Sequence, residues 1–246
     1  MEMIIAYLID SLGTLKTCSL TCRSWYIAAV PYIHHTLILR DKRSDKLHDH
    51  LKPLSELHKL GLVPLVNTIT IRQWIDSRWF IPQAFSASDL RHFSAFTNVR
   101  TLKIDYMDIS CLTPDIERYF GHLSATLRSV TLYNPSCTPR QLSHFLSLFS
   151  NLDDIYIRWG YVLKPNVTTP DTELVQFSAP ELRGELRLYG SGWAETWTHL
   201  ITSCGGLRFR SMDLYKVGIC APILFKACAE TLETLRFYAS DDSVSK

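Results

Sequence analysis

Apolar residues recur along the chain in one short phrase, apolar-x-x-apolar-x-apolar. The five regular copies and two copies stretched by one or two residues are Val66/Ile69/Ile71, Val99/Leu102/Ile104, Leu127/Val130/Leu132, Leu152/Ile155/Ile157, Leu232/Leu235/Phe237, Leu182/Leu186/Leu188 and Leu207/Met212/Leu214. Their last apolar positions lie 23 to 33 residues apart. Alternating apolar residues indicate short strands, and a recurrence of this kind indicates repeated structural units.

Most intervals between these phrases carry a helical pattern. The stretch Thr138-Pro139-Arg140-Gln141 is typical of a helix start, with Thr at the N-cap and Gln three residues later. Thr113-Pro114 opens a similar helix. Further helices are expected at Asp45 to Leu60, Ser88 to Phe96, Ala194 to Cys204 and Pro222 to Thr231, and a long loop at Tyr161 to Ala179. The alternation of strand, turn and helix predicts an α/β fold with a curved parallel sheet, in which each unit covers the apolar edge of its neighbour.

The first 33 residues predict three short helices instead. The third, beginning at Trp25, should end at Pro31. Leu15, Cys18, Cys22 and Trp25 follow steps of three, four and three residues, which would place them along one stripe of a helix. We interpret this stripe as a buried face, because free Cys behaves as a small hydrophobe. A zinc half-site is the alternative, and it would need ligands from elsewhere in the chain.

Composition narrows the class of protein. The 246 residues are 46 % hydrophobic, enough for a substantial core, and a formal net charge of +2 gives no overall attraction to nucleic acid or membranes. Seven cysteines without a repeated spacing favour reduced thiols, and the N-terminus lacks the layout of a signal peptide. We therefore expect a soluble cytoplasmic and/or nuclear protein without a metal or cofactor. Gly190-Ser191-Gly192 only partly matches a hydrolase elbow, which leaves an esterase a remote alternative.

The start of the chain resembles a known module. The half with Leu15, Cys18, Leu20, Cys22, Arg23 and Trp25 matches the pattern Leu-x-x-Cys-x-Leu-x-Cys-Arg-x-Trp of an F-box, most like those of F-box proteins with irregular leucine-rich repeats in mushroom-type (basidiomycete) fungi. The family's usual Leu-Pro start is absent. The strand phrases that follow resemble the irregular repeats of the same family, which extends the likeness over nearly the whole chain. It divides the chain into an F-box at 1–40 and a leucine-rich-repeat solenoid at 41–246.

This resemblance implies a non-catalytic substrate-recognition subunit of a Skp–cullin–F-box ubiquitin ligase. The helices would bind a Skp-type adaptor, and through it a cullin scaffold, and the repeats would hold the target protein. The expected adaptor contacts are Ile4, Leu8, Leu15, Leu20 and Trp25. The alternative is an interaction scaffold without a ligase role, in which the shortened F-box only caps the solenoid.

Residues between and just after the two strand hydrophobics should point away from the core. Nine of these fourteen positions are Tyr or Arg, the residue types that dominate interface hot spots. The expected target-binding residues are Tyr133, Tyr156, Arg158, Arg187, Tyr189, Tyr215, Arg236 and Tyr238. Five basic and two acidic residues among the fourteen favour an acidic or phosphorylated target. The alternative is that Tyr simply suits exposed strand positions and Arg keeps the surface soluble.

Overall fold

The computed structural model describes residues 11–40, 56–72, 94–106, 114–135, 137–158, 182–189, 207–216 and 221–238, together with 4, 5, 8 and 109. Its eight strands form one parallel sheet in which strand order follows chain order. They are β1 (Thr36–Arg40), β2 (Thr68–Arg72), β3 (Thr101–Asp105), β4 (Ser129–Tyr133), β5 (Asp154–Arg158), β6 (Leu182–Tyr189), β7 (Leu207–Tyr215) and β8 (Thr234–Tyr238). The helices are α2 (Leu12–Ser19), α3 (Arg23–Ile33), α6 (Pro114–Leu123), α7 (Pro139–Ser147) and α9 (Ala221–Cys228), with a short 3-10 turn at Val63–Leu65.

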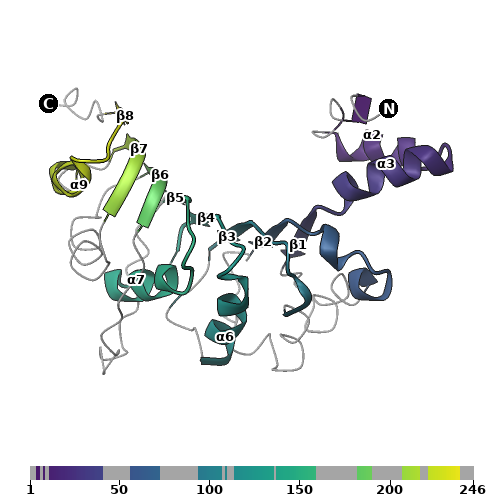
Figure 1. The fold of residues 1–246 in the computed structure, drawn as a ribbon, viewed down its shortest axis with the longest axis horizontal. Coiled ribbons are helices and arrows are strands. Elements are labelled where there is room, and N and C mark those ends of the chain that lie inside the picture. Colours follow the sequence, from purple (N-terminus) through teal and green to yellow (C-terminus); the bar gives the residue numbers. More distant parts are fainter. Residues whose placement is uncertain are drawn as a thin grey trace, which may run out of the picture.

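The sheet bends into an arc, and α6, α7 and α9 lie on its convex side (Figure 1). Helices α2 and α3 stand beyond β1, apart from the convex layer (Figure 1). The prediction of an α/β fold with a parallel sheet is confirmed, and the last two apolar residues of each of the seven phrases lie on strands β2 to β8.

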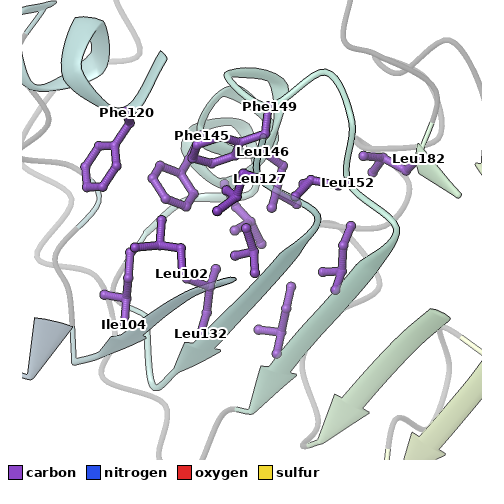
Figure 2. Packing of buried hydrophobic residues seen from close by; sticks show 14 of the residues in the cluster. Leu102, Ile104, Phe120, Leu127, Leu132, Phe145, Leu146, Phe149, Leu152 and Leu182 are labelled. Atoms are coloured by element: carbon purple, nitrogen blue, oxygen red, sulfur yellow. The ribbon is translucent and has the colours of Figure 1, made fainter. Parts of the chain in front are cut away.

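Alternate residues of each strand build the core on the convex side. Parallel pairing in register stacks each apolar pair on the next, as with Leu102 on Ile69 and Val130 on Leu102. These residues are fully buried. Figure 2 shows Phe120, Phe145 and Phe149 above the strand residues Leu102, Ile104 and Leu132. Phe145 contacts Phe120 and Phe149 edge to face, with ring centroids 5.6 and 5.3 Å apart, so aromatic packing joins α6 to α7.

The start of α7 has the capping box that the sequence predicts. The Thr138 side chain accepts a hydrogen bond from the backbone N–H of Gln141, at 3.3 Å, and the Gln141 side chain accepts one from the Thr138 N–H, at 2.8 Å. Two N–H groups that have no partner within the helix are thereby satisfied. This fixes the point at which the chain leaves β4 and enters the convex layer.

The turns before the strands repeat one hydrogen-bond pattern. The carbonyl of Asn67 accepts two backbone N–H groups from the next unit, those of Arg100 and Thr101, and the carbonyl of Arg128 likewise accepts those of Asp153 and Asp154. These bonds begin one residue before each strand and set its register. Successive units therefore add to the sheet by the same rule.

The sheet begins earlier in the chain than we expected. β1 lies inside residues 1–40, and it pairs with β2 through Leu37 opposite Ile69 and Leu39 opposite Ile71. The structure therefore puts the change from helices to sheet between Ile33 and Thr36 rather than at residue 40. The apolar phrase is incomplete at this strand because His34 occupies the place of its first apolar residue.

The helix predictions have mixed outcomes. α6, α7 and α9 confirm the helices expected after Thr113, after Thr138 and near Pro222. Pro31 does not end the third N-terminal helix, since α3 continues to Ile33 and the His34 N–H still bonds to the Val30 carbonyl. A proline in the last turn removes a single hydrogen bond, which a helix that ends two residues later tolerates. The helix expected at 45–60 is described only from residue 56, and it is helical at 56–59. The helix expected at 88–96 is described only from residue 94, where the chain forms a 3-10 turn at 94–95. The expected helix at 194–204 and loop at 161–179 lie outside the described residues.

Candidate functional site

The concave face of the sheet is built from three rows of side chains that run across the strands. Because the strands pair in register, Tyr133, Arg158, Tyr189, Tyr215 and Tyr238 lie opposite one another in the last row. The middle row contains Lys103, Thr131, Tyr156, Arg187, Asp213 and Arg236, and the first row contains Ser129, Asp154, Glu185, Ser211 and Thr234. All eight expected target-binding residues therefore come together on one face, over β4 to β8.

Five tyrosines on this face form one continuous chain of ring contacts, which we call the tyrosine ladder: Tyr133, Tyr156, Tyr189, Tyr215 and Tyr238. Successive ring centroids lie 5.5, 6.0, 4.8 and 5.8 Å apart. The pair Tyr189 and Tyr215 is stacked, with 23° between the ring planes. Aromatic neighbours on adjacent strands hold one another in place, so the ladder offers a large, preorganised contact surface.

Two cations border the ladder. The Arg158 guanidinium lies 5.8 Å from the centre of the Tyr189 ring, and the Lys216 ammonium lies 5.8 Å from that of Tyr215. Both distances are in the range of cation–π attraction. Arg158 also hydrogen-bonds with the side chain of Tyr156, whose pKa is raised, chiefly by burial. The ladder therefore presents aromatic rings beside positive groups.

Lys216 is a site residue that the sequence patterns missed. It follows β7 directly and has a left-handed backbone, with φ of 57°, as do Tyr106 after β3 and Asn134 after β4. Each of the three donates its backbone N–H to the carbonyl of the last residue of the next strand. The turn brings the side chain back beside the ladder, and Lys or Tyr at such a position gives no signal of a left-handed turn in the sequence.

The charge balance of this face differs from our expectation. The first row adds Asp154 and Glu185, so the three rows on β2 to β8 contain five basic and four acidic residues, a net charge of +1 instead of +3. Arg187 donates two hydrogen bonds to Glu185, at 2.9 and 2.7 Å, and Arg72 pairs with Asp105 at 3.3 Å. The positive surplus of this face is therefore smaller than we expected, and Arg158 and Lys216 are cations that lie beside the ladder.

The pKa values of two acidic residues in the first row are shifted in opposite directions. Burial, with Glu185 and Asp153 nearby, raises the pKa of Asp154, although Arg187 opposes the shift. The hydrogen bonds from Arg187 lower the pKa of Glu185. In the middle row, one carboxylate oxygen of Asp213 is buried without a hydrogen-bond partner between the register positions of Arg187 and Arg236.

The second candidate site is the N-terminal helical unit, α2 and α3 with the described residues before them. It has a small core of its own, Ile5, Leu15 and Ala29, which is separate from the core of the sheet. Other large apolar residues of the unit are exposed to solvent, and these are Ile4, Leu12, Leu20, Tyr26 and Ile27. Exposed apolar residues gathered on a unit this small indicate an interaction surface.

The five residues expected to contact an adaptor differ in their exposure to solvent. Ile4 and Leu20 are exposed, Leu20 to 86 %, and both are available to a partner. Leu8 and Trp25 are partly buried and pack against the small core. Leu15 is completely buried, so the expectation that it contacts an adaptor is wrong. Tyr26 and Ile27 are also exposed, although the F-box pattern does not include them.

The prediction that Cys18 and Cys22 lie along one face of a single helix is also wrong. α2 ends at Ser19, and the side chains of Ser19 and Thr21 bond to the carbonyls of Lys16 and Cys18. These local hydrogen bonds compete with continuation of the helix. Cys22 is the extended, exposed residue before α3, so it does not share a face with Cys18.

Among the described cysteines, Cys18, Cys22 and Cys228 are free thiols, and Cys137 is buried. In the part of the chain that the structure describes, no three His, Cys, Asp or Glu side chains are grouped so that they could hold a metal ion. Ser191, the nucleophile of the esterase alternative, lies outside the described residues.

Comparison with known proteins adds no identification: no family model, no curated protein and no solved structure matches the chain. Over the described ranges, the helices are too short or too polar to cross a membrane. The function has to be argued from the two surfaces described above.

Proposed function

We propose that the chain is the substrate-recognition subunit of a Skp–cullin–F-box ubiquitin ligase. In this role the N-terminal helical unit is an F-box that binds a Skp-type adaptor, and a cullin scaffold joins through that adaptor. The sheet with its convex helices is an irregular leucine-rich-repeat solenoid whose concave face holds the target. The subunit catalyses no reaction itself: it raises the local concentration of target lysines near a conjugating enzyme.

One observation carries the proposal. The exposed apolar residues of the helical unit, such as Leu20 and Ile27, belong to a unit whose core is separate from that of the sheet. A unit that only capped the solenoid would turn its apolar residues onto the first strand and join the sheet core. Exposure on a separate body instead supports docking to a second protein, and it weighs against the scaffold alternative.

The target side of the proposal is supported by the tyrosine ladder. Tyr supplies large contact area at low cost in side-chain entropy, and the ladder's ring contacts already fix the rings before binding. Arg158 and Lys216 beside the rings would favour an acidic or phosphorylated group at this point of the target.

Binding of a recombinant Skp-type adaptor tests the ligase role. We expect a stable complex by pull-down and calorimetry, weakened at least tenfold by Leu20→Glu or Ile27→Glu, because a carboxylate would be buried without a partner. Ile38→Glu is the matched control, since Ile38 is also an exposed apolar residue but lies on β1. No binding by the wild-type chain at micromolar concentration would leave the scaffold alternative.

Proximity labelling in cells tests the target face. The double variant Tyr189→Ala and Tyr215→Ala should lose the labelled target while the adaptor is still labelled. Thr234→Ala, an exposed change on the same face, should lose neither. Retention of the target by the tyrosine variant would contradict the proposed role of the ladder.

A further inference from the structure

The tyrosine ladder has a regular spacing along the sheet. In the last row, Tyr133, Tyr189 and Tyr238 lie on β4, β6 and β8, which is every second strand, and Arg158 lies on β5 between the first two. Neighbouring strands of a sheet are about 4.8 Å apart, so the three tyrosine positions recur at about 9.6 Å. A ligand that runs across the strands therefore meets a tyrosine once in each such interval.

The rings present their edges and hydroxyl groups to such a ligand. Tyr189 and Tyr215 lie on neighbouring strands with stacked rings, so their planes face each other along the sheet and the rings stand up from it. The hydroxyl is at the far end of the ring from Cβ, which makes it the outermost atom. The ladder residues on β4 to β7 are partly exposed, and Tyr238 is 48 % exposed. The ladder therefore offers a row of hydroxyl donors between apolar ring edges.

Among regular peptide conformations, polyproline II fits this spacing best. It repeats every three residues, or about 9.3 Å, so it differs from two strand spacings by only about 0.3 Å per turn. An α-helix has a pitch of about 5.4 Å and differs from one strand spacing by about 0.6 Å at every strand. A β-strand repeats at about 6.7 Å, which matches neither one strand spacing nor two.

The hydrogen-bonding groups of polyproline II also suit the ladder. This conformation makes no internal hydrogen bonds, so its carbonyls are free to accept from the tyrosine hydroxyls. Proline itself has no N–H and so brings no donor that would need a partner on the ladder. A proline-rich segment is already stiff before it binds, and it therefore loses little conformational entropy. Spacing and hydrogen bonding thus favour the same kind of segment.

The cations beside the ladder specify the charge of that segment. The Arg158 guanidinium and the Lys216 ammonium each lie 5.8 Å from the centre of a ladder ring. Asp105, the acidic residue of the last row on β2 to β8, is paired with Arg72 at 3.3 Å. A carboxylate over β5 would be attracted by Arg158, whereas an ammonium at the same point would be repelled. The segment should therefore be acidic as well as proline-rich.

We propose that the tyrosine ladder binds an acidic, proline-rich segment of the target in the polyproline II conformation. The segment crosses β4 to β8, packs prolines three residues apart on Tyr133, Tyr189 and Tyr238, and places a carboxylate beside Arg158. The inference rests on the proposed function, in which the concave face holds the target, and it names the chemistry of the segment that is held.

A labelled peptide of three Pro-Glu-Pro repeats is the probe, because it has prolines three residues apart and one glutamate in every turn. The control is the same peptide made of D-amino acids, which keeps the composition and charge but forms the mirror-image helix. By fluorescence anisotropy with the full chain, we expect the L-peptide to bind at least tenfold more tightly. Equal binding of the two peptides would indicate attraction by charge alone and overturn the proposal. So would the absence of saturable binding at about 1 mM L-peptide.

Variants of the protein locate the binding surface. The double variant Tyr189→Phe and Tyr238→Phe keeps the rings and removes two hydroxyl donors, so it should weaken binding of the L-peptide several-fold. Arg158→Gln should weaken it at least fivefold and make the affinity less sensitive to salt. Thr234→Ala, an exposed change in the first row, should leave binding unchanged. Wild-type affinity in both the Phe variant and Arg158→Gln would place the peptide elsewhere and overturn the proposal.

Adaptor binding, measured on the same samples, separates this inference from the proposed function. Thermal melting first confirms that each variant is folded. Loss of the L-peptide by the Phe variant with unchanged adaptor binding is the result that we expect. A wild-type chain that binds the adaptor but not the L-peptide would overturn the polyproline segment and leave the ligase role in place. A chain that binds the L-peptide but not the adaptor would support the segment and contradict the ligase role.

Discussion

Gly184 approaches Asp153 so closely that a Cβ atom on it would overlap the carbonyl group of Asp153. The contact lies where the register of β6 shifts, and the neighbouring N–H of Glu185 donates a 2.7 Å hydrogen bond to that same carbonyl. Gly184 also has a φ of 89°, which residues with a side chain rarely adopt. The extra residue at this irregularity is Arg210 of β7, which has no partner on β6, and beyond it Glu185, Arg187 and Tyr189 lie in the three rows of the concave face.

Gly184→Ala should therefore destabilise the fold strongly. Backbone atoms cannot move aside cheaply, so we expect a loss of about 3 kcal/mol or more in the free energy of unfolding, measured by urea denaturation. Gly121→Ala is the matched control, because nothing lies near a Cβ at that helical position. It should gain about 0.5–1 kcal/mol through helix propensity. A loss for Gly184→Ala below about 1 kcal/mol would mean that the two strands can separate easily.

The stacked pair Tyr189 and Tyr215 should show a measurable coupling. A double-mutant cycle with Ala at both positions is expected to give an interaction energy of about 0.5–1.5 kcal/mol, because the rings lie 4.8 Å apart and nearly parallel. Tyr133 and Tyr215 lie three strands apart, and this control pair should be additive within about 0.5 kcal/mol. Coupling of equal size in both pairs would indicate a change of the whole sheet rather than ring contact.

The apolar phrases predict the strands and two rows of the concave face well, because burial of alternate residues imposes period two on the sequence. They miss β1, where His34 replaces an apolar residue, and the row with Asp154 and Glu185, because polar residues at strand starts follow no pattern. The prediction of one helix face with Cys18 and Cys22 was wrong for another reason. Helical spacing continues past Ser19 in the sequence, but hydrogen bonds from Ser19 and Thr21 to the backbone end the helix there.

The capping box of α7 should contribute measurable stability. Thr138→Ala removes the acceptor for the Gln141 N–H, and we expect a loss of about 1 kcal/mol in the free energy of unfolding. Gln141→Glu should preserve stability, since a carboxylate also accepts the Thr138 N–H and suits a helix N-terminus. Circular dichroism during urea denaturation measures both. Equal losses for the two variants would contradict the capping role.

Asp154→Asn should stabilise the protein at neutral pH. Burial and Glu185 raise the pKa of Asp154 in the fold above its unfolded value of 3.8, so its contribution to stability is present below that pH and is lost as pH rises through the folded pKa. At pH 7 the variant avoids that loss, so its melting temperature should rise. The rise should be small, on the order of 1 °C, because the Asp154 side chain is largely solvated. The gain should vanish near pH 3.5. Asp153→Asn, which loses contacts to Arg128 and Arg183, should show no gain.

His34 should make the stability depend on pH near neutrality. Burial, together with Lys16, lowers the pKa of His34 below its ordinary value of 6.5. The unfolded chain then takes up a proton at a higher pH than the fold does, so stability is present above pH 6.5 and is lost as pH falls below it. We expect wild type to lose more stability than His34→Asn between pH 7.5 and 5.5, measured by urea denaturation at each pH. Lys16→Gln should reduce the difference only in part, because burial is the larger cause. Parallel pH profiles of wild type and His34→Asn would show that the imidazole is as easily protonated in the fold as in the unfolded chain.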